Sequence, residues 1–223
     1  MKTLTDIFLE KSFKYIRKFW KNGRWNYVYE EPNGRVSYNR PVYRQFVGKA
    51  SAAIKHLFAQ KQGQALDVAE IMLPAIDIDE NVKPFEVIQT DGKQLLVPTS
   101  IDLIWGSKTK GLFHLLLRHF VQQDDFKTIQ AAEDFVVGSL KRMKTNPEDF
   151  TVTFNGNKGS YHIIDKHGNS FVVGTEFSED SNGKGLVRHF VMTSYDYRNP
   201  DYKQNSRTEM NKRYMEVTKQ RTY

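Results

Sequence analysis

The sequence predicts an α+β fold in which two helices pack on one face of a four-stranded antiparallel sheet. Apolar residues recur at helical spacing over 110–123 and again over 126–144. Four short β-prone runs then follow between residues 149 and 197. Turn signals separate these runs at Asn155-Gly156, at His167-Gly168 and within 179–185. Helices followed by a strand meander form two packed layers, which is the basis of the prediction.

Local patterns predict the elements that precede these two helices. Apolar residues near helical spacing predict a helix over 4–20, and aromatic runs on either side of 31–34 predict a hairpin. The periodicity of 43–62 predicts a further helix. A second, short hairpin is predicted to turn at Asp91-Gly92. The apolar run 100–106 then predicts a buried strand.

Composition limits the class of protein. With 223 residues, 39% hydrophobic and 26% charged, the chain is long enough for one substantial soluble domain with extensions, or for two small domains. No run approaches the roughly 18 apolar residues of a membrane span, and the first residues do not form a signal peptide. The absence of cysteine excludes disulfides, thiol chemistry and cysteine zinc sites. We expect a cytoplasmic protein, or one delivered into the cytoplasm of a target cell.

Positive charge is concentrated at the two ends of the chain. Residues 1–48 hold ten lysines and arginines against four acids, and residues 199–223 hold six against three. The central part, 49–198, is nearly neutral, with 17 against 19. We therefore divide the chain into a basic aromatic N-terminal extension, a central domain and a basic C-terminal tail. Basic ends favour polyanion-binding arms, although solvated lysine-rich termini explain the charges equally well.

The predicted helix 110–123 carries residues suited to phosphate chemistry. His114 and Arg118 lie four residues apart and share a face, whereas His119 lies about 140° round the helix from His114. A histidine transfers protons near neutral pH, and an arginine supplies paired donors for a phosphate group. The alternative is a half-buried histidine beside an ordinary surface arginine, which is the commoner explanation of such a pair.

The last predicted strand adds a second group of polar residues. Period-two alternation places Phe190 and Met192 on one face, where they would cover the helices. The opposite, open face would carry His189, Val191, Thr193 and Tyr195, with Arg188 close by. Hydroxyls and an imidazole near a cation suit phosphate binding. A solvated polar face with residues of high β-propensity remains the alternative.

Metal and cofactor motifs are not predicted. His162 and His167 have a metal-like interval, but on a strand their rings point to opposite faces. The acidic segment 75–86 lacks the glycine and the spacing of a calcium loop. We therefore expect no metal site and no cofactor.

Two segments resemble the phage-encoded nuclease domains grouped with barnase, EndoU, the tRNase colicins and RelE. The segment 100–120 is similar to the opening motif of these domains, and 188–196 is similar to their final strand. The matched positions of the first motif are Ile101, Asp102, Leu103, Ile104, Trp105, Gly106, Gly111, Leu112, His114, Arg118 and His119. The resemblance covers about 49–198. His189 departs from it, because the family usually has asparagine there.

The resemblance implies a barnase/EndoU/colicin/RelE-like fold and a metal-independent endoribonuclease. In such enzymes the ribose 2′-OH attacks the adjacent phosphate and leaves a 2′,3′-cyclic phosphate. It implies a proton-transfer role for His114, with His119 orienting it or acting second. Phosphate binding falls to Arg188 and Arg118, while the remaining matched positions hold the phosphate or ribose: Thr193, Tyr195 and His189.

The expected partner is RNA, with tRNA one candidate, together with a proteinaceous inhibitor and no membrane. The protein would act as a phage-derived toxin or effector. The alternative is a catalytically inactive phage-derived module that binds nucleic acid or a virion partner.

Overall fold

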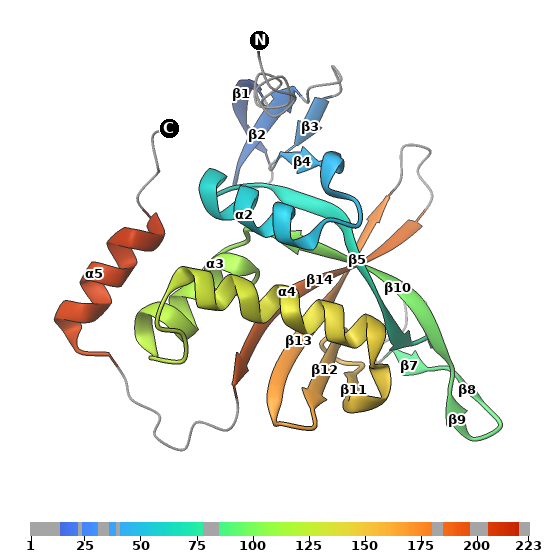
Figure 1. Cartoon of the computed structure of the whole chain (residues 1–223). Helices are drawn as coiled ribbons and strands as arrows, with labels where there is room; N and C mark the ends of the chain where they lie inside the picture. The colour runs from blue at the N-terminus through green and yellow to red at the C-terminus, as the bar shows by residue number, and fades with distance from the viewer. Residues whose placement is uncertain are drawn as a thin grey trace, which may run out of the picture.

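A seven-stranded mixed sheet forms the centre of the protein (Figure 1). It is seen in a computed structural model that describes residues 14–21, 24–30, 36–38, 41–77, 85–179, 185–196 and 205–218. In spatial order the strands are β11 (Phe150–Asn155), β12 (Ser160–Asp165), β13 (Asn169–Glu179), β14 (Gly185–Asp196), β10 (Leu96–Ile104), β5 (Gln64–Pro74) and β4 (Val42–Tyr43). Helices α2 (Ala50–Gln60), α3 (Leu112–Leu115) and α4 (Ile129–Thr145) cover one face.

The prediction of a four-stranded antiparallel sheet with two helices is wrong. The meander of β11 to β14 is antiparallel as expected, but β10 adds to β14 in parallel and β5 adds to β10. Strand β5 escaped prediction because a bulge interrupts its alternation. The register of β5 with β10 shifts opposite Asp102, and Asp67 has a positive φ of 53° there. The parallel pairing of β10 and β14 joins distant segments, which no local pattern reports.

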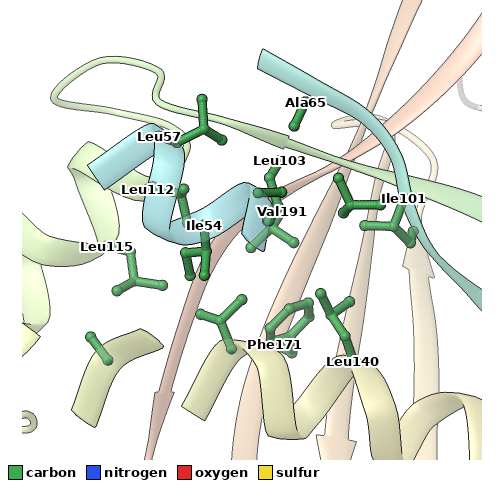
Figure 2. Close-up of a cluster of buried hydrophobic side chains, with 14 of the residues drawn as sticks. Ile54, Leu57, Ala65, Ile101, Leu103, Leu112, Leu115, Leu140, Phe171 and Val191 are labelled. Carbon is green, nitrogen blue, oxygen red and sulfur yellow. The ribbon is translucent and has the colours of Figure 1, made fainter. Parts of the chain in front are cut away.

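The hydrophobic core lies between the sheet and its helices (Figure 2). The helices contribute Ile54, Leu57, Leu112, Leu115 and Leu140, and the sheet contributes Ala65, Ile101, Leu103, Phe171 and Val191. Each of these side chains is almost completely buried. Burying a side chain of leucine or isoleucine size stabilises a fold by about 1.5–3 kcal/mol, so this layer fixes how the helices sit on the sheet.

Helix α4 begins three residues later than predicted, because Thr128 caps it. The Thr128 side chain accepts a hydrogen bond from the backbone N–H of Ala131 at 3.0 Å. The predicted helix 43–62 is also shorter. Its first residues form the 3₁₀ turn η1 (Arg44–Phe46) and a loop in which Gly48 has a φ of 68°. Both helices therefore exist as predicted, with later starts.

The predicted helix 110–123 changes its winding part-way. After the single turn of α3, residues Leu116–Gln122 form the π-helix η2. The hydrogen bonds of a π-helix join residues five apart, and such segments often occur at functional sites. Residues five apart therefore lie more nearly on one face than in an α-helix.

The helix predicted over 4–20 is wrong for its described part. Residues Lys14–Lys21 form strand β1, which pairs with β2 (Arg24–Glu30), while residues 1–13 lie outside the described residues. The aromatic and β-branched residues of this segment suit a strand once a partner strand is present. The predicted hairpin is confirmed, since β2 pairs with β3 (Val36–Tyr38).

The remaining elements lie outside the seven-stranded sheet and the helices that cover it. The hairpin of β8 (Gln89–Thr90) and β9 (Lys93–Gln94) turns at Asp91 and Gly92 as predicted, and both residues have positive φ. Strand β6 (Ile76–Asp77) pairs with β7 (Glu86–Val87), and η3 (Pro147–Asp149) precedes β11. The C-terminal helix α5 (Arg207–Thr218) packs against η2 and places Val217 in the core. Among the described residues, no helix combines the length and the apolar character needed to cross a bilayer.

Candidate functional site

His119 makes two hydrogen bonds, one to the connection after η2 and one to the last strand. Its Nδ1 lies 2.8 Å from Oδ2 of Asp125, and its Nε2 lies 3.0 Å from Oγ1 of Thr193. A carboxylate only accepts, so Nδ1 carries the proton that it donates to Asp125. In the neutral ring Nε2 is then an acceptor, and the Thr193 hydroxyl donates to it. The three side chains form one directed chain of hydrogen bonds from carboxylate to hydroxyl.

Local backbone structure positions each member of this chain. The N–H groups of Asp125 and Phe126 both donate to the carbonyl of His119, which folds the connection after η2 back over the histidine. Strand β10 pairs with β14 only at His189 and Phe190, so the edge of β14 beyond them is open to η2. Thr193 lies on this open edge. His119 is 6% exposed, whereas Thr193 is only half-buried and forms the accessible end of the chain.

His114 is also held by a single oriented contact. Its Nδ1 lies 2.7 Å from the carbonyl oxygen of Lys108, which only accepts, so Nδ1 donates and Nε2 is left as the acceptor. The loop that presents this carbonyl depends on Gly106, whose φ is 80°. A Cβ at that position would lie 2.0 Å from the carbonyl oxygen of Lys110. The matched glycine therefore shapes the loop that orients His114.

Arg188 is bound to carboxylates. Its Nε and Nη2 lie 2.5 and 2.7 Å from the two oxygens of Asp102, which is 3% exposed. Nη2 also lies 3.2 Å from Asp67, whose N–H donates to Asp102 at 2.8 Å. Hydrogen bonding to Asp102 raises the pKa of Arg188. Burial raises the pKa of Asp102 against the lowering effect of Arg188. The predicted phosphate ligand is thus engaged in an internal ion pair.

The predicted faces of β14 are wrong. Val191, expected on the open face, is completely buried in the core beneath the helices. His189 points into the interior, with its ring 5.7 Å from that of buried Tyr161. Phe190, expected to cover the helices, instead has Lys110 Nζ 5.2 Å from its ring centroid. Alternation did not show which face the helices cover, and β14 itself departs from strict alternation, because a bulge lies between Val191 and Thr193.

His189 lies in a desolvated environment. Burial, followed by the positive charge of Arg188, lowers the pKa of His189 to about 4. Its Nδ1 lies 3.5 Å from the Thr175 hydroxyl, at the limit of a hydrogen bond. The ring is therefore neutral near pH 7, and it is half-buried beside Tyr161.

Two further predicted residues have less definite positions. Arg118 is exposed on η2, and its Nη1 lies 3.4 Å from the side-chain oxygen of Gln122. Tyr195 pairs with Ser170 through its backbone, and the structure does not describe its side chain. Of the predicted set, the structure thus joins His119 directly to Thr193 and places Arg188 in a separate ion-pair network.

Sequence reasoning missed Asp125 and the helix α5. Asp125 follows a matched histidine by six residues, an interval that corresponds to no helical face until the π winding and its turn are known. An acidic residue shortly after a candidate histidine was the available signal. The contribution of α5 depends on tertiary packing, and the sequence offers no signal for it.

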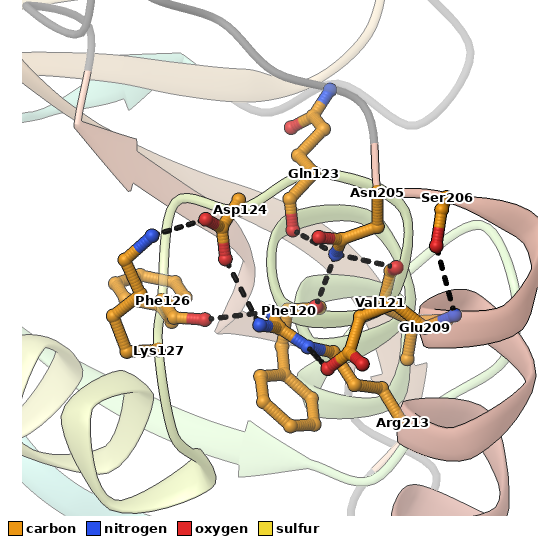
Figure 3. A network of polar contacts seen from close by, with 10 residues as sticks. All are labelled: Phe120, Val121, Gln123, Asp124, Phe126, Lys127, Asn205, Ser206, Glu209 and Arg213. Carbon is orange, nitrogen blue, oxygen red and sulfur yellow. Dashed lines mark hydrogen bonds and ion pairs between the residues drawn. The ribbon is translucent and has the colours of Figure 1, made fainter.

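Helix α5 and the residues just before it supply hydrogen-bond donors to the end of η2 (Figure 3). The Asn205 side-chain amide donates to the carbonyls of Phe120, Val121 and Gln123 at 2.9–3.2 Å. Arg213 Nη1 donates to the carbonyls of Phe120 and Phe126 at 2.9 and 3.2 Å. The same guanidinium pairs with Asp124 and Glu209. The last carbonyls of a helix lack partners within it, so α5 stabilises the helix end that leads to Asp125.

Comparison with protein-family models, with curated proteins and with solved structures finds no match. The resemblance to the phage nuclease domains therefore stays a prediction. Within the ranges that the structure describes, no three His, Asp or Glu side chains are grouped as metal ligands would be.

Proposed function

We propose that the protein is a metal-independent endoribonuclease in which His119 transfers the proton. The observation that carries the proposal is the chain of hydrogen bonds from Asp125 through His119 to Thr193. A carboxylate on Nδ1 fixes the tautomer of the ring and stabilises the imidazolium that forms when Nε2 takes up a proton. A hydroxyl on Nε2 occupies the position that a substrate hydroxyl needs.

The proposed reaction begins at the Thr193 end of this chain. The ribose 2′-OH replaces the Thr193 hydroxyl as the donor to His119 Nε2, and its proton moves to that nitrogen as the 2′-oxygen attacks phosphorus. The bond from phosphorus to the 5′-oxygen breaks, and a protonated His114 Nε2 gives the leaving oxygen its proton. The products are a 2′,3′-cyclic phosphate and a 5′-hydroxyl. Arg118, on the same helical segment, is the cation proposed to bind the phosphate.

A second candidate function is a catalytically inactive RNA-binding module. It is favoured by the low exposure of His119 and by the engagement of Arg188 with Asp102. In that case the hydrogen bonds from Asp125 through His119 to Thr193 only hold η2 against β14. The roles of a phage-derived toxin or effector, and of a proteinaceous inhibitor, rest on the resemblance alone.

Incubation with total RNA in EDTA, followed by end-group analysis, tests the proposal. We expect cyclic-phosphate ends and a loss of about 10²–10⁴-fold in His119→Ala. His162→Ala is the matched control, because His162 is exposed on β12. Cleavage that survives His119→Ala, or that stops with EDTA, would contradict the mechanism. Salt-sensitive binding without cleavage would support the inactive module.

A further inference from the structure

A lysine-lined cavity lies away from the His119 site. It has a volume of about 780 Å³ and is formed by the start of α2, the second half of α4 and β5. This volume is within the range of about 300–1,000 Å³ that is usual for ligand sites. Four lysines from the two helices line it: Lys49, Lys55, Lys141 and Lys144. We call it the α2–α4 cavity.

The charges of the α2–α4 cavity are unbalanced. Lys49, Lys141 and Lys144 make no ion pair with any residue in the described ranges, whereas Lys55 lies 3.6 Å from Glu133. The acids in the lining are Glu70 and Asp67, and Asp67 is already paired with Arg188. Three exposed lysines without an ion-pair partner in the described ranges thus line the cavity together with one unpaired acid, and this excess of positive charge favours an anionic ligand.

Backbone groups add to this positive potential. Helix α2 has no acidic residue in its first turn, and its N-cap residue, Lys49, makes no capping hydrogen bond with its side chain. The first N–H groups of a helix have no partner within it. The residues of this first turn, Ala50, Ser51 and Ala52, are part of the cavity lining. The apolar part of the lining, including Val137 and Leu140, provides a surface for a base or ribose.

The cavity continues along the groove between the two helices. A second cavity, of about 420 Å³, shares Lys55 with it and extends to Thr128 at the start of α4. The connection that contains Asp125 leads directly into Thr128. A bound strand would therefore run along the helices towards the segment that carries His119.

We propose that the α2–α4 cavity binds backbone phosphates of an RNA strand outside the site of cleavage. The choice of RNA rests on the proposed function, whereas the chemistry of the site requires only a phosphate group. A free nucleotide has the same chemistry, and the experiment separates the two sources.

The experiment measures binding of a short single-stranded DNA by fluorescence anisotropy over a range of salt concentrations. DNA lacks the 2′-OH and is not cleaved, so binding is measured independently of catalysis. Lys141→Gln/Lys144→Gln should reduce the slope of log affinity against log salt by about 1.4, at about 0.7 per lost phosphate contact. Lys93→Gln/Lys158→Gln is the control, since it removes the same charge at exposed positions outside the cavity. Circular dichroism checks that both variants are folded.

Each outcome decides the proposal. A smaller slope in the cavity variant alone supports it, even if the wild-type protein cleaves no RNA, in which case only the proposed function fails. Saturable binding of ATP by calorimetry, lost in the cavity variant while the DNA slope is unchanged, assigns the site to a free nucleotide and overturns the RNA assignment. Equal slopes in both variants, with no ATP binding, overturn the site itself.

Discussion

Arg188 on β14 and Asp102 on β10 face each other across the parallel strands, with Nη2 2.7 Å from Oδ1. The N–H of Asp67 on β5 donates to the same carboxylate oxygen. Three neighbouring strands are therefore joined at one buried carboxylate. Its position is where the meander of β11 to β14 meets the strands that precede it in the chain.

The first prediction follows from this pair. Arg188→Ala leaves Asp102 buried without its partner, so we expect the free energy of unfolding to fall by about 3–5 kcal/mol. Urea denaturation measures the change. Because the cost arises from the unpaired charge, Arg188→Met/Asp102→Leu should recover most of it. A stable Arg188→Ala variant that has lost RNA cleavage would instead return Arg188 to the phosphate-binding role that the resemblance implies.

The second prediction concerns the hydroxyl of Thr193. Thr193→Val keeps the shape of the side chain but leaves His119 Nε2 without a donor, at a cost to stability of about 1–3 kcal/mol. Thr193→Ser should retain this stability, because it keeps the hydroxyl. If His119 acts in catalysis, both variants should retain cleavage, because the ribose 2′-OH takes the place of the Thr193 hydroxyl. Unfolding and cleavage rates of both variants are compared with those of wild type. Equal stability of the valine and serine variants would show that the contact contributes little.

The third prediction is a loss of stability in mild acid. The pKa of His189 is lowered to about 4, against about 6.5 in an unfolded chain. Between these values the unfolded state binds more protons, so the free energy of unfolding falls as pH falls through this window. The full contribution is about 3 kcal/mol. It is measured by urea denaturation at a series of pH values.

His189→Asn should flatten this pH dependence. Burial also lowers the pKa of His56, so His56→Asn is the comparison that separates the two contributions. Unfolding energies of wild type and His189→Asn that decline in parallel from pH 6.5 to 4 would contradict the assignment.

The fourth prediction assigns a positioning role to α5. Arg213→Met removes the donors to the carbonyls of Phe120 and Phe126 while keeping an apolar stem over the Phe120 ring. We expect faster hydrogen exchange in η2 and a reduced cleavage rate. Lys212→Met, at the exposed neighbouring position, is the control. Unchanged exchange in η2 would show that α5 packs on this segment without stabilising it.

Local pattern predicted the elements in the second half of the chain well. The β11–β14 meander alternates regularly except at one bulge between β13 and β14, and its turns carry Asn155-Gly156 and His167-Gly168, so neighbouring strands could be paired from sequence. Strand β5 could not be identified, because Asp67 in a left-handed conformation breaks its alternation. Strand β1 was mistaken for a helix since Ile16 and Trp20 fit both periodicities and only its partner strand decides.

The sequence identified several residues of the candidate site but not the contacts that they make. His119 and Thr193 came from matched motifs and are in contact. Arg188 came from the same motif, but its use depends on Asp102, which is 86 residues away in the chain and reaches it through the pairing of β10 with β14. The contact of Asp125 with His119 depends on a π-helical turn, and residue types alone do not predict such a turn.

The parallel pairing of β10 with β14 has a consequence for how the protein folds. The β11–β14 hairpins close over short loops, whereas Asp102 and Arg188 are 86 residues apart in the chain. Contacts of such long sequence separation are slow to form, because the entropy of closing the loop is lost before the contact is gained. During synthesis β10 can pair with β5, but its other edge stays unpaired until β14 has emerged. The last step of sheet closure is also the step that brings Thr193 to His119.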